Sequence, residues 1–300
     1  MTHTDTTDTT DTTDTTDITA VDGSHRGSGA ETATRTPERD RRPIRVVGPL
    51  AVFAAFIGMW YFVSWVVLPE YKEFLLPVPH HVLSSVFTDW DKMSPILSAL
   101  WLTTQVAVIG FFISVVLGLT IGIVMSLADW IEWSLWPYAI ALQCIPILAL
   151  TPLIGGLLGF SFSARVVVTV MISLFPILSN TLFGILGTDR LSMDLFRLNH
   201  CSRARTLWKL QLPGAMPSIF AGCRISAGLA VIGAVVGDTF FRQGEPGIGA
   251  LIDVYRLRLQ GEEMMACIIL AALLGLSVFV VVGTVSRRAV GHWHESTRTQ

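Results

Sequence analysis

The chain has few charged side chains and almost no lysine. Only 15% of its 300 residues are charged, against roughly 25% in an average soluble domain, whereas 51% are hydrophobic and the mean hydropathy is +0.57. Its lysines are Lys72, Lys92 and Lys209, and none follows the glycine pattern of a phosphate-binding P-loop. The composition therefore predicts an integral membrane protein, and the missing motif excludes ATP binding by a P-loop.

Cysteine is also scarce and scattered. The cysteines are Cys144, Cys201, Cys223 and Cys267. They lack C-x-x-C and Cys/His spacing, so we interpret them as small apolar fillers and expect neither a disulfide framework nor a zinc site. His80 and His81 are adjacent, but no paired carboxylate or cysteine lies nearby to complete a metal site. We expect no metal and no cofactor.

The first 40 residues contain no apolar run that resembles a signal peptide, so we expect a cytoplasmic N-terminus. Aspartates recur every three residues among threonine pairs from Asp5 to Asp17, followed by a Gly/Ser/Thr stretch and an arginine cluster. Such a segment cannot bury enough apolar surface to offset its chain entropy. Residues 1–45 are therefore predicted to be a disordered cytoplasmic tail.

Apolar segments dominate the rest of the chain. A spanning helix needs about 20 mostly apolar residues, and the qualifying segments are 46–68, 97–127, 136–157, 165–187, 218–241 and 263–286. They predict an all-α, polytopic membrane bundle of about six transmembrane helices. The predicted membrane domain is 46–286, and 287–300 is a short cytoplasmic tail.

The distribution of Lys and Arg predicts that both termini are cytoplasmic. With the N-terminus inside, the cytoplasmic segments hold Arg26, Arg35, Arg39, Arg41, Arg42, Arg45, Arg190, Arg197, Arg203, Arg205, Lys209, Arg287, Arg288 and Arg298. The external segments hold Lys72, Lys92, Arg165, Arg242, Arg256 and Arg258. This excess agrees with the positive-inside rule.

A basic, helix-forming stretch lies between the fourth and fifth predicted spans and reads DLFRLNHCSRARTLWKLQLPGAMP. Leu191, Leu195 and Leu198 recur at i, i+4 and i+7, which predicts a short helix with an apolar stripe. Asn199 and His200 interrupt it, and because asparagine enters the left-handed region readily, we expect a tight turn here.

A second short helix is predicted after this turn. Ser202 is expected to cap it, and it extends through Lys209. Pro213 and Pro217 end the excursion, with Pro217 placed to begin the fifth span. Residues 188–217 thus predict a cytoplasmic helical hairpin. Basic loops also serve simply to set topology, but a loop of this size favours a docking surface.

Four motifs carry a resemblance to a known family. They are LLPVPHHVL, LQCIPILALTPLIGGLLGF, FPILSNTLFGI and LPGAMPSIFAGCRIS. From Leu76 to the C-terminus the chain resembles inner-membrane permease subunits of binding-protein-dependent ABC importers, in the nitrate/sulfonate/taurine and thiamine- or riboflavin-precursor branch. The resemblance implies a type I ABC importer permease fold, transport by alternating access, and ATP hydrolysis by a separate subunit.

The hairpin departs from the family signature E-A-A-x-x-x-G at its beginning. Asp194, Leu195 and Phe196 occupy the E-A-A positions, and His200 occupies the glycine. The resemblance implies that the hairpin is a coupling helix in a cleft of a cytoplasmic ATPase, and the bulk of Phe196 suggests a dedicated partner. The expected coupling residues are Asp194, Leu195, Phe196, Arg197, Leu198, His200, Arg203, Arg205, Leu212, Pro213 and Pro217.

Polar residues within the spans are candidates for the translocation pathway, because a charge in hydrocarbon is costly and usually faces the bundle or a cavity. We expect Asp238 to line or gate the pathway near the outer face, with Arg242 or Glu245 as neighbours. The alternative is a structural ion pair between Asp238 and Arg242, spaced i, i+4. Asn180 is a pathway candidate or a helix-to-helix hydrogen-bonding residue, and Arg224 is interpreted as a topology anchor.

The resemblance further implies three partners: a cytoplasmic ATPase, an extracytoplasmic solute-binding protein and a second copy of the chain. Besides membrane lipid we expect no others, and no nucleic acid. The segment GEPGIGALIDVYRLRLQ is interpreted as an outer re-entrant or interfacial element that receives the binding protein or simply connects two spans. The substrate candidates are sulfonates, taurine, nitrate and pyrimidine or riboflavin-type precursors.

Two other functions fit the sequence less well. A secondary transporter should show inverted repeats or interrupted spans with midplane charge, and the charges instead cluster at span ends. A membrane-embedded enzyme is disfavoured because H-E-x-x-H, G-x-S-x-G and paired intramembrane acids are missing from the sequence.

Overall fold

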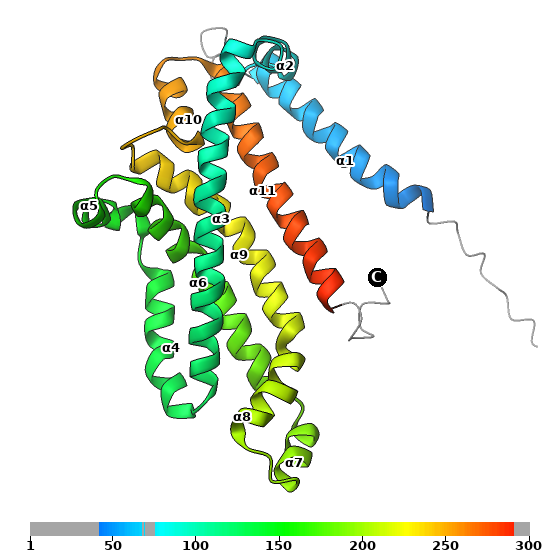
Figure 1. Ribbon diagram of the computed structural model, residues 1–300. Helices are drawn as coiled ribbons and strands as arrows, with labels where there is room; N and C mark the ends of the chain where they lie inside the picture. Colours follow the sequence, from blue (N-terminus) through cyan, green and yellow to red (C-terminus); the bar gives the residue numbers. More distant parts are fainter. Residues whose placement is uncertain (1–41, 68, 70–75, 291–300) are drawn as a thin grey trace, which may run out of the picture. The chain divides into compact units, whose positions relative to one another are not determined.

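The computed structural model describes residues 42–67, 69 and 76–290, with side chains from 47 to 289 (Figure 1). These residues form helices and no strands. The α-helices are α1 (Arg42–Phe62), α2 (Pro79–Val86), α3 (Trp90–Ser126), α4 (Asp129–Cys144), α5 (Ile147–Leu158), α6 (Phe162–Leu186), α7 (Arg190–Leu198), α8 (Arg203–Thr206), α9 (Leu212–Phe240), α10 (Ile248–Leu257) and α11 (Gly261–Val290). Two π-helical segments, η1 (Val63–Val67) and η3 (Leu207–Gln211), follow α1 and α8.

The chain divides into two units, Met1–Val52 and Phe53–Gln300. Of the first unit, the structure describes the beginning of α1, so most of the predicted tail at 1–45 lies outside the described residues. The helix nevertheless begins at Arg42, inside the predicted tail. At the other end α11 continues to Val290, beyond the predicted boundary at 286.

Among the described residues, five helices are long and apolar enough to cross a membrane, or six if α4 and α5 count as one broken span. The prediction of one continuous span at 136–157 is wrong, because α4 and α5 meet at an angle of 96°. Ile145 and Pro146 between them are extended. Proline disfavours the helical conformation of the residue before it and cannot donate a helix hydrogen bond, which explains the break.

Helix α6 packs against α3 on one side and α9 on another (Figure 1). Small residues make the approach to α3 close: a Cβ at Gly118 would come within 2.9 Å of Ile177, and one at Gly122 within 2.8 Å of Thr181. Ser114, between these glycines and Gly110, shares a hydrogen bond of 2.7 Å with Ser173. Small residues and interhelical hydrogen bonds are what stabilises helix contacts in lipid.

Glycines also bring α6 and α9 close together. A Cβ at Gly222 would lie 2.7 Å from the carbonyl oxygen of Pro176, and one at Gly233 would lie 2.8 Å from the Cα of Thr169. Because these neighbours are backbone atoms, they cannot move aside easily. The three helices α3, α6 and α9 therefore form a closely packed core, with α11 against α9.

The short helices lie at opposite ends of this core (Figure 1). Helices α7 and α8 are at one end, called here the hairpin end. Helices α2 and α10 are at the other, called here the distal end, where Val82, Val86 and Ile96 pack with Ile248 and Ala266.

Candidate functional site

Helix α7 forms the first arm of the hairpin and starts with a side-chain cap. Asp189 accepts hydrogen bonds of 3.0 Å from the backbone N–H and the hydroxyl of Ser192. The backbone N–H of Ser192 is the main reason that the pKa of Asp189 is lowered. This N-cap satisfies an orphan donor of the first turn and fixes where α7 begins.

The turn after α7 is a Schellman motif with His200 in the left-handed conformation. The N–H of His200 donates to the carbonyl of Arg197 at 2.9 Å, and that of Cys201 to Phe196 at 3.1 Å. His200 has a φ of 49°, whereas Asn199 has a φ of −82°. The predicted tight turn is therefore present, but its left-handed residue is His200 and not Asn199, whose side-chain amide donates to the carbonyl of Leu195 at 2.8 Å. His200 occupies the position where the resemblance places a glycine.

The second arm runs without a break into the membrane-spanning helix. Ser202 caps α8 as predicted, accepting from the N–H of Arg205 at 3.4 Å. Helices α8, η3 and α9 form one helical stretch, Arg203–Phe240. The prediction that Pro217 begins the fifth span is wrong, since Pro217 lies inside α9. In η3 the N–H of Leu212 reaches back five residues to Leu207, so a π-helical register brings the chain to Pro213.

Buried apolar contacts hold this second arm to the core. Leu207 is buried and belongs to a cluster with Ile185 of α6 and Ala215 and Ile219 of α9. Thr188, just after α6, donates to the carbonyl of Ile185 at 2.8 Å. The hairpin is thus fastened to both helices that it connects.

Unlike its base, the tip of the hairpin exposes apolar side chains. Leu191, Leu195 and Leu198 are 80%, 58% and 78% exposed. Phe196 is half-buried, and Arg197 pairs with Asp194 at 3.3 Å on the surface. The other exposed side chains of the hairpin include Arg203, Arg205 and Trp208. An apolar stripe beside arginines, left uncovered by the described chain, suits a protein partner with a groove.

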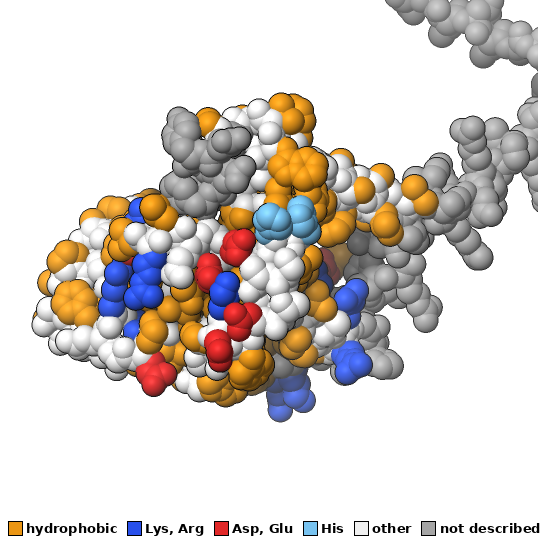
Figure 2. Space-filling model, turned by 90° about the horizontal axis from the view of Figure 1, so that it is seen from above, with side chains coloured by type: hydrophobic (Ala, Val, Ile, Leu, Met, Phe, Trp, Pro, Cys, Tyr) orange, Lys and Arg blue, Asp and Glu red, His pale blue; other side chains and the backbone are white. Residues whose placement is uncertain are grey.

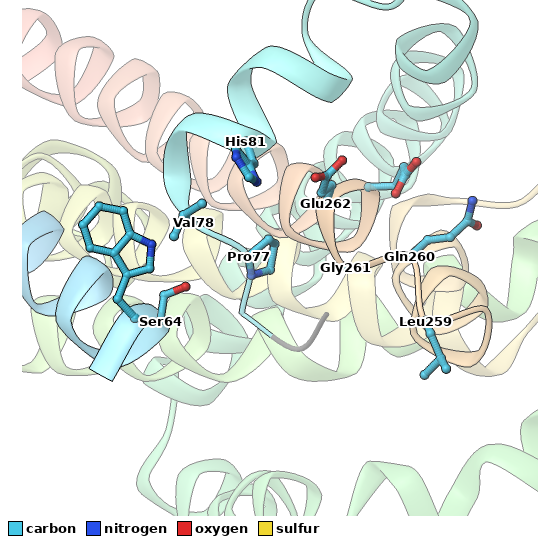
Figure 3. A pocket seen from close by; sticks show the side chains of 10 residues that line it. Ser64, Pro77, Val78, His81, Leu259, Gln260, Gly261 and Glu262 are labelled. Atoms are coloured by element: carbon cyan, nitrogen blue, oxygen red, sulfur yellow. The ribbon is translucent and has the colours of Figure 1, made fainter. Parts of the chain in front are cut away.

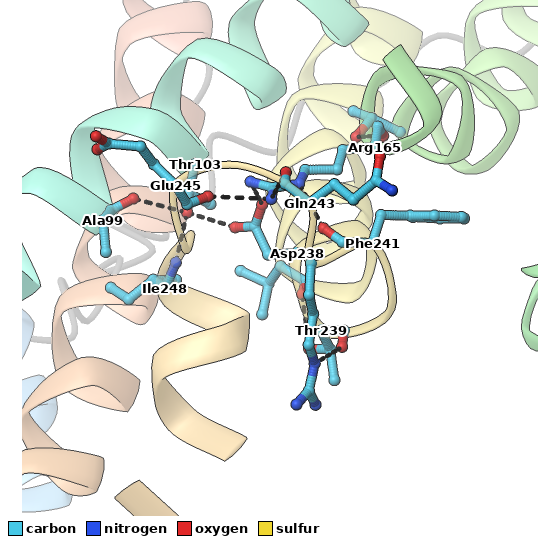
Figure 4. A network of polar contacts seen from close by, with 12 residues as sticks. Ala99, Thr103, Arg165, Asp238, Thr239, Phe241, Gln243, Glu245 and Ile248 are labelled. Atoms are coloured by element: carbon cyan, nitrogen blue, oxygen red, sulfur yellow. Dashed lines mark hydrogen bonds and ion pairs between the residues drawn. The ribbon is translucent and has the colours of Figure 1, made fainter. Parts of the chain in front are cut away.

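A buried polar network lies near the distal end of the core (Figure 4). Arg165 of α6, only 1% exposed, pairs with Asp238 of α9 at 3.3 Å. Its Nε donates to the carbonyl of Phe241 at 2.8 Å, and its Nη2 to those of Gln243 and Glu245 at 3.2 and 3.1 Å. This guanidinium therefore joins α6, α9 and the loop after α9.

Thr103 brings α3 and α10 into the same network. Its hydroxyl lies 2.5 Å from Asp238 Oδ2, and it accepts a hydrogen bond of 2.8 Å from the N–H of Ile248, the first residue of α10. Gly247 lies directly against the Asp238 carboxylate, where a Cβ would clash. Solvent does not reach the carboxylate at the centre of this network, because Asp238 is fully buried.

The predicted ion pair between Asp238 and Arg242 is wrong. Arg242 points away and pairs with Asp253 of α10, and Asp253 also accepts from Arg256 Nη2 at 2.6 Å. The hydrogen bonds from Arg256 and Arg242 lower the pKa of Asp253. Figure 2 looks onto the distal end, where one basic side chain lies among acidic ones near the centre of the view and other basic side chains gather to one side.

Asn180 lies where α6 meets α9. Its amide donates to the carbonyl of Pro176 at 2.8 Å, and its Cβ lies against Gly222. The pathway role of Asn180, Asp238 and Arg242 stays a prediction. Sequence reasoning missed Arg165 and Thr103. The signal that could have identified Arg165 was its depth in the membrane. Arg165 begins the predicted span 165–187 and Asp238 lies near the end of the predicted span 218–241, and these two ends lie at the same membrane face.

A pocket of about 400 Å³ opens at the distal end (Figure 3). Its walls come from η1, from the start of α2 with the segment before it, and from the start of α11 with the turn before it, and Ser64, His81 and Glu262 are among the lining residues. Gln260 contributes a buried Oε1 that has no hydrogen-bond partner among the residues that the structure describes. A buried acceptor without a donor suits a pocket that receives a polar group from outside.

Comparisons with known proteins agree with this architecture. Residues 114–292 match the family described as the binding-protein-dependent transport system inner membrane component. The chain is 28% identical to the formylaminopyrimidine transport permease protein ThiX of Halalkalibacterium halodurans, covering 81% of this chain and 94% of the relative. It is 31% identical to the riboflavin transport system permease protein RibX of Chloroflexus aurantiacus, covering 77% and 85%.

A third relative is the putative aliphatic sulfonates transport permease protein SsuC of Escherichia coli K12, with 32% identity covering 76% of this chain and 85% of the relative. Among solved structures, the inward-facing MetNI methionine ABC transporter superposes with a TM-score of 0.55 and 16% identity, covering 66% of this chain and 99% of that chain. That likeness shows the fold. Since the family match spans more than half of the chain, this protein belongs to the binding-protein-dependent inner membrane components, the permeases of ABC importers.

Proposed function

We propose that this permease forms a solute pathway through the cytoplasmic membrane and that the hairpin transmits the movement of a cytoplasmic ATPase to it. The observation that carries the proposal is the continuous helix Arg203–Phe240. One of its ends lies in the exposed hairpin, and the other holds Asp238 in the buried network. At 1.5 Å per residue this stretch is about 57 Å long, enough to carry a displacement across a bilayer.

The exposed face of the hairpin is the proposed ATPase contact. Leu195 and Leu198 are exposed knobs for an apolar groove, Phe196 supports them, and Arg203 and Arg205 add polar contacts around the apolar stripe. The coupling set predicted from sequence, Asp194 to Pro217, stays part of this proposal. Pro213 and Pro217 lie in the first turns of α9 and contribute by fixing how the arm enters the span.

The hairpin end faces the cytoplasm in this proposal, because the excess of Lys and Arg at that end agrees with the positive-inside rule. The distal end then faces outward, and its pocket and α10 provide the surface for an extracytoplasmic binding protein. Two copies of the chain, related by a two-fold axis, would present two hairpins to a pair of ATPase subunits. ATP is hydrolysed in those subunits and not in this chain.

Substrates of the relatives narrow the solute class. They include a formylaminopyrimidine, riboflavin and aliphatic sulfonates. We propose a small solute of this range, and we favour the heterocyclic precursors, toward which the segment GEPGIGALID points by its resemblance to that branch. The secondary-transporter alternative is not retained, because the chain belongs to an ABC family.

Co-purification tests the hairpin contact. The chain is expressed with the ATPase encoded beside it, as wild type and as the double variant Phe196→Asp/Arg203→Glu, with Arg258→Gln at the distal end as the matched control. The wild type and the control should bring down the ATPase in equal amounts, and the double variant at least tenfold less. Equal recovery with all three proteins would refute the hairpin as the docking element.

A further inference from the structure

Arg224 is a cation within a membrane-spanning helix that no described side chain neutralises. It lies on α9 and forms no ion pair within the described residues, and its Nε is buried without a hydrogen-bond partner. Its guanidinium carbon sits 5.2 Å from the centre of the Phe279 ring on α11. A cation in a spanning helix is costly, and an aromatic face offsets this only in part. An anionic group beside the guanidinium would therefore lower this cost.

No acid of α3, α6, α9 or α11 lies near enough to pair with Arg224. The acids of α3, α9 and α11 are Asp91, Asp238, Glu262 and Glu263, and α6 has none. All four lie toward the distal end, and Asp238 is about 21 Å from Arg224 along α9 at 1.5 Å per residue. A second copy related by a two-fold axis along the membrane normal keeps its residues at the same depth. Asp91, Asp238, Glu262 and Glu263 of such a copy therefore do not reach Arg224 either.

The guanidinium of Arg224 lies directly against the backbone of α11. A Cβ at Gly283 of α11 would come within 2.8 Å of Arg224 Nη2, so the glycine leaves room for the charged group against that helix. Phe279, Gly283 and Arg287 follow one another at four-residue intervals and share one face of α11. Arg287, which is exposed, adds a second positive charge about 6 Å further toward the hairpin end.

From Arg224 an apolar groove of about 600 Å³ extends between α9 and α11 toward the distal end. Its lining includes Gly228, Val231, Ile232, Gly275, Leu276 and Phe279. The groove is open because two glycines line it without side chains. A Cβ at Gly228 would meet nothing within 4 Å, and one at Gly275 would make only an ordinary contact with Val231. Phe279 belongs both to the groove and to the Arg224 contact, so the two features are continuous.

We propose that this site binds one anionic phospholipid, with its phosphate at Arg224 and Arg287 and an acyl chain in the groove between α9 and α11. A small free anion would satisfy the arginines but leave the groove empty, whereas a zwitterionic lipid would bring its own cation to a basic site. Basic sites between spanning helices near the cytoplasmic side suit anionic headgroups. The placement in the cytoplasmic leaflet rests on the proposed orientation.

Native mass spectrometry of the delipidated full chain, titrated with phosphatidylglycerol and with phosphatidylcholine of the same acyl chains, tests the site. Wild type should retain one phosphatidylglycerol per chain and bind phosphatidylcholine at least tenfold more weakly. Arg224→Gln should lose this preference, and Arg224→Lys should keep part of it. Gly275→Leu, which fills the groove without touching the arginine, should weaken binding of phosphatidylglycerol tenfold or more, while Arg258→Gln should leave binding unchanged.

Three results would overturn the proposal. Equal binding of both lipids to wild type would show that the site does not select an anionic headgroup. Unchanged phosphatidylglycerol binding by Arg224→Gln would show that Arg224 does not bind the phosphate. A shift of Gly275→Leu from dimer to monomer with lipid retention unchanged would show that a second copy covers the groove. Recovery of the ATPase with the same variants is measured in parallel, so a failure here is separated from a failure of the coupling proposal.

Discussion

At the scale of single residues, Arg165 is the side chain on which the distal network depends. It is buried, pairs with Asp238 and donates to three backbone carbonyls of the loop after α9. Removing one partner of a buried pair leaves the other charge uncompensated. We predict that Arg165→Met lowers the free energy of unfolding by about 3–5 kcal/mol.

The double variant Arg165→Met/Asp238→Leu should recover a large part of this loss, because no buried charge remains. Thermal unfolding in detergent provides the measurement, and Arg258→Gln, an exposed arginine at the same end, is the control. A double variant as unstable as the single one would contradict this explanation. The loss of stability would then come from the hydrogen bonds of Arg165 to the loop and not from the unpaired charge.

Asp253 gives a pH-dependent prediction. Hydrogen bonds from Arg256 and Arg242 lower its pKa in the folded protein, so the stabilisation is present above the unfolded value of about 4 and is lost as pH falls through the folded pKa. The difference in melting temperature between wild type and Asp253→Asn should be full at pH 7 and shrink below about pH 4. A difference that stays constant down to pH 3 would contradict this account.

The residues of the buried network could be predicted only in part from the sequence. Asp238 was recognised as an exceptional intramembrane acid, but its partner was sought four residues away on the same helix. The true partner, Arg165, is 73 residues away, and only the packing of α6 against α9 brings it near. Spacing along one helix predicts local pairs and cannot report a contact between helices.

At the scale of elements, the contact between α6 and α9 depends on glycine. Gly222 faces the backbone of Pro176 and the side chain of Asn180. We predict that Gly222→Ala destabilises the protein by about 1–3 kcal/mol through overpacking. Gly228→Ala is the matched control on the same helix, because its Cβ would enter open space, and it should be neutral or stabilising by up to about 1 kcal/mol. Equal melting temperatures for the two variants would argue against the close helix contact.

The turn of the hairpin offers a second prediction at this scale. His200 adopts a left-handed conformation that costs a non-glycine residue about 1–2 kcal/mol. His200→Gly should therefore increase the hydrogen-exchange protection of α7 amides by several fold. Asn199→Gly is the control, because Asn199 has an ordinary negative φ and the substitution removes the hydrogen bond from its side-chain amide to the carbonyl of Leu195. It should decrease the protection. The opposite order would contradict the assigned turn.

The elements themselves were largely predictable, because long apolar runs define spanning helices. The bend between α4 and α5 was not expected, although Pro146 is present in the predicted span 136–157. Prolines at 95, 176 and 217 lie inside continuous helices of the same protein. A proline alone therefore does not distinguish a broken span from a tolerated one, and the surrounding packing decides.

At the scale of the whole molecule, the family predicted from four motifs is confirmed, and so is the all-helical membrane fold. The motifs are local and specific, which is why they identified the family despite identities near 30%. The groove between α9 and α11 could not have been foreseen, because it depends on the missing side chains of Gly228 and Gly275 on two different helices.

The most direct test of the central claim is ATP turnover by the complete complex in proteoliposomes, with ATP on the hairpin side and the binding protein on the distal side. The account predicts that the solute-loaded binding protein stimulates turnover several fold together with solute uptake, and that Phe196→Asp/Arg203→Glu abolishes both. Uptake that continues without ATP and follows an ion gradient would contradict it.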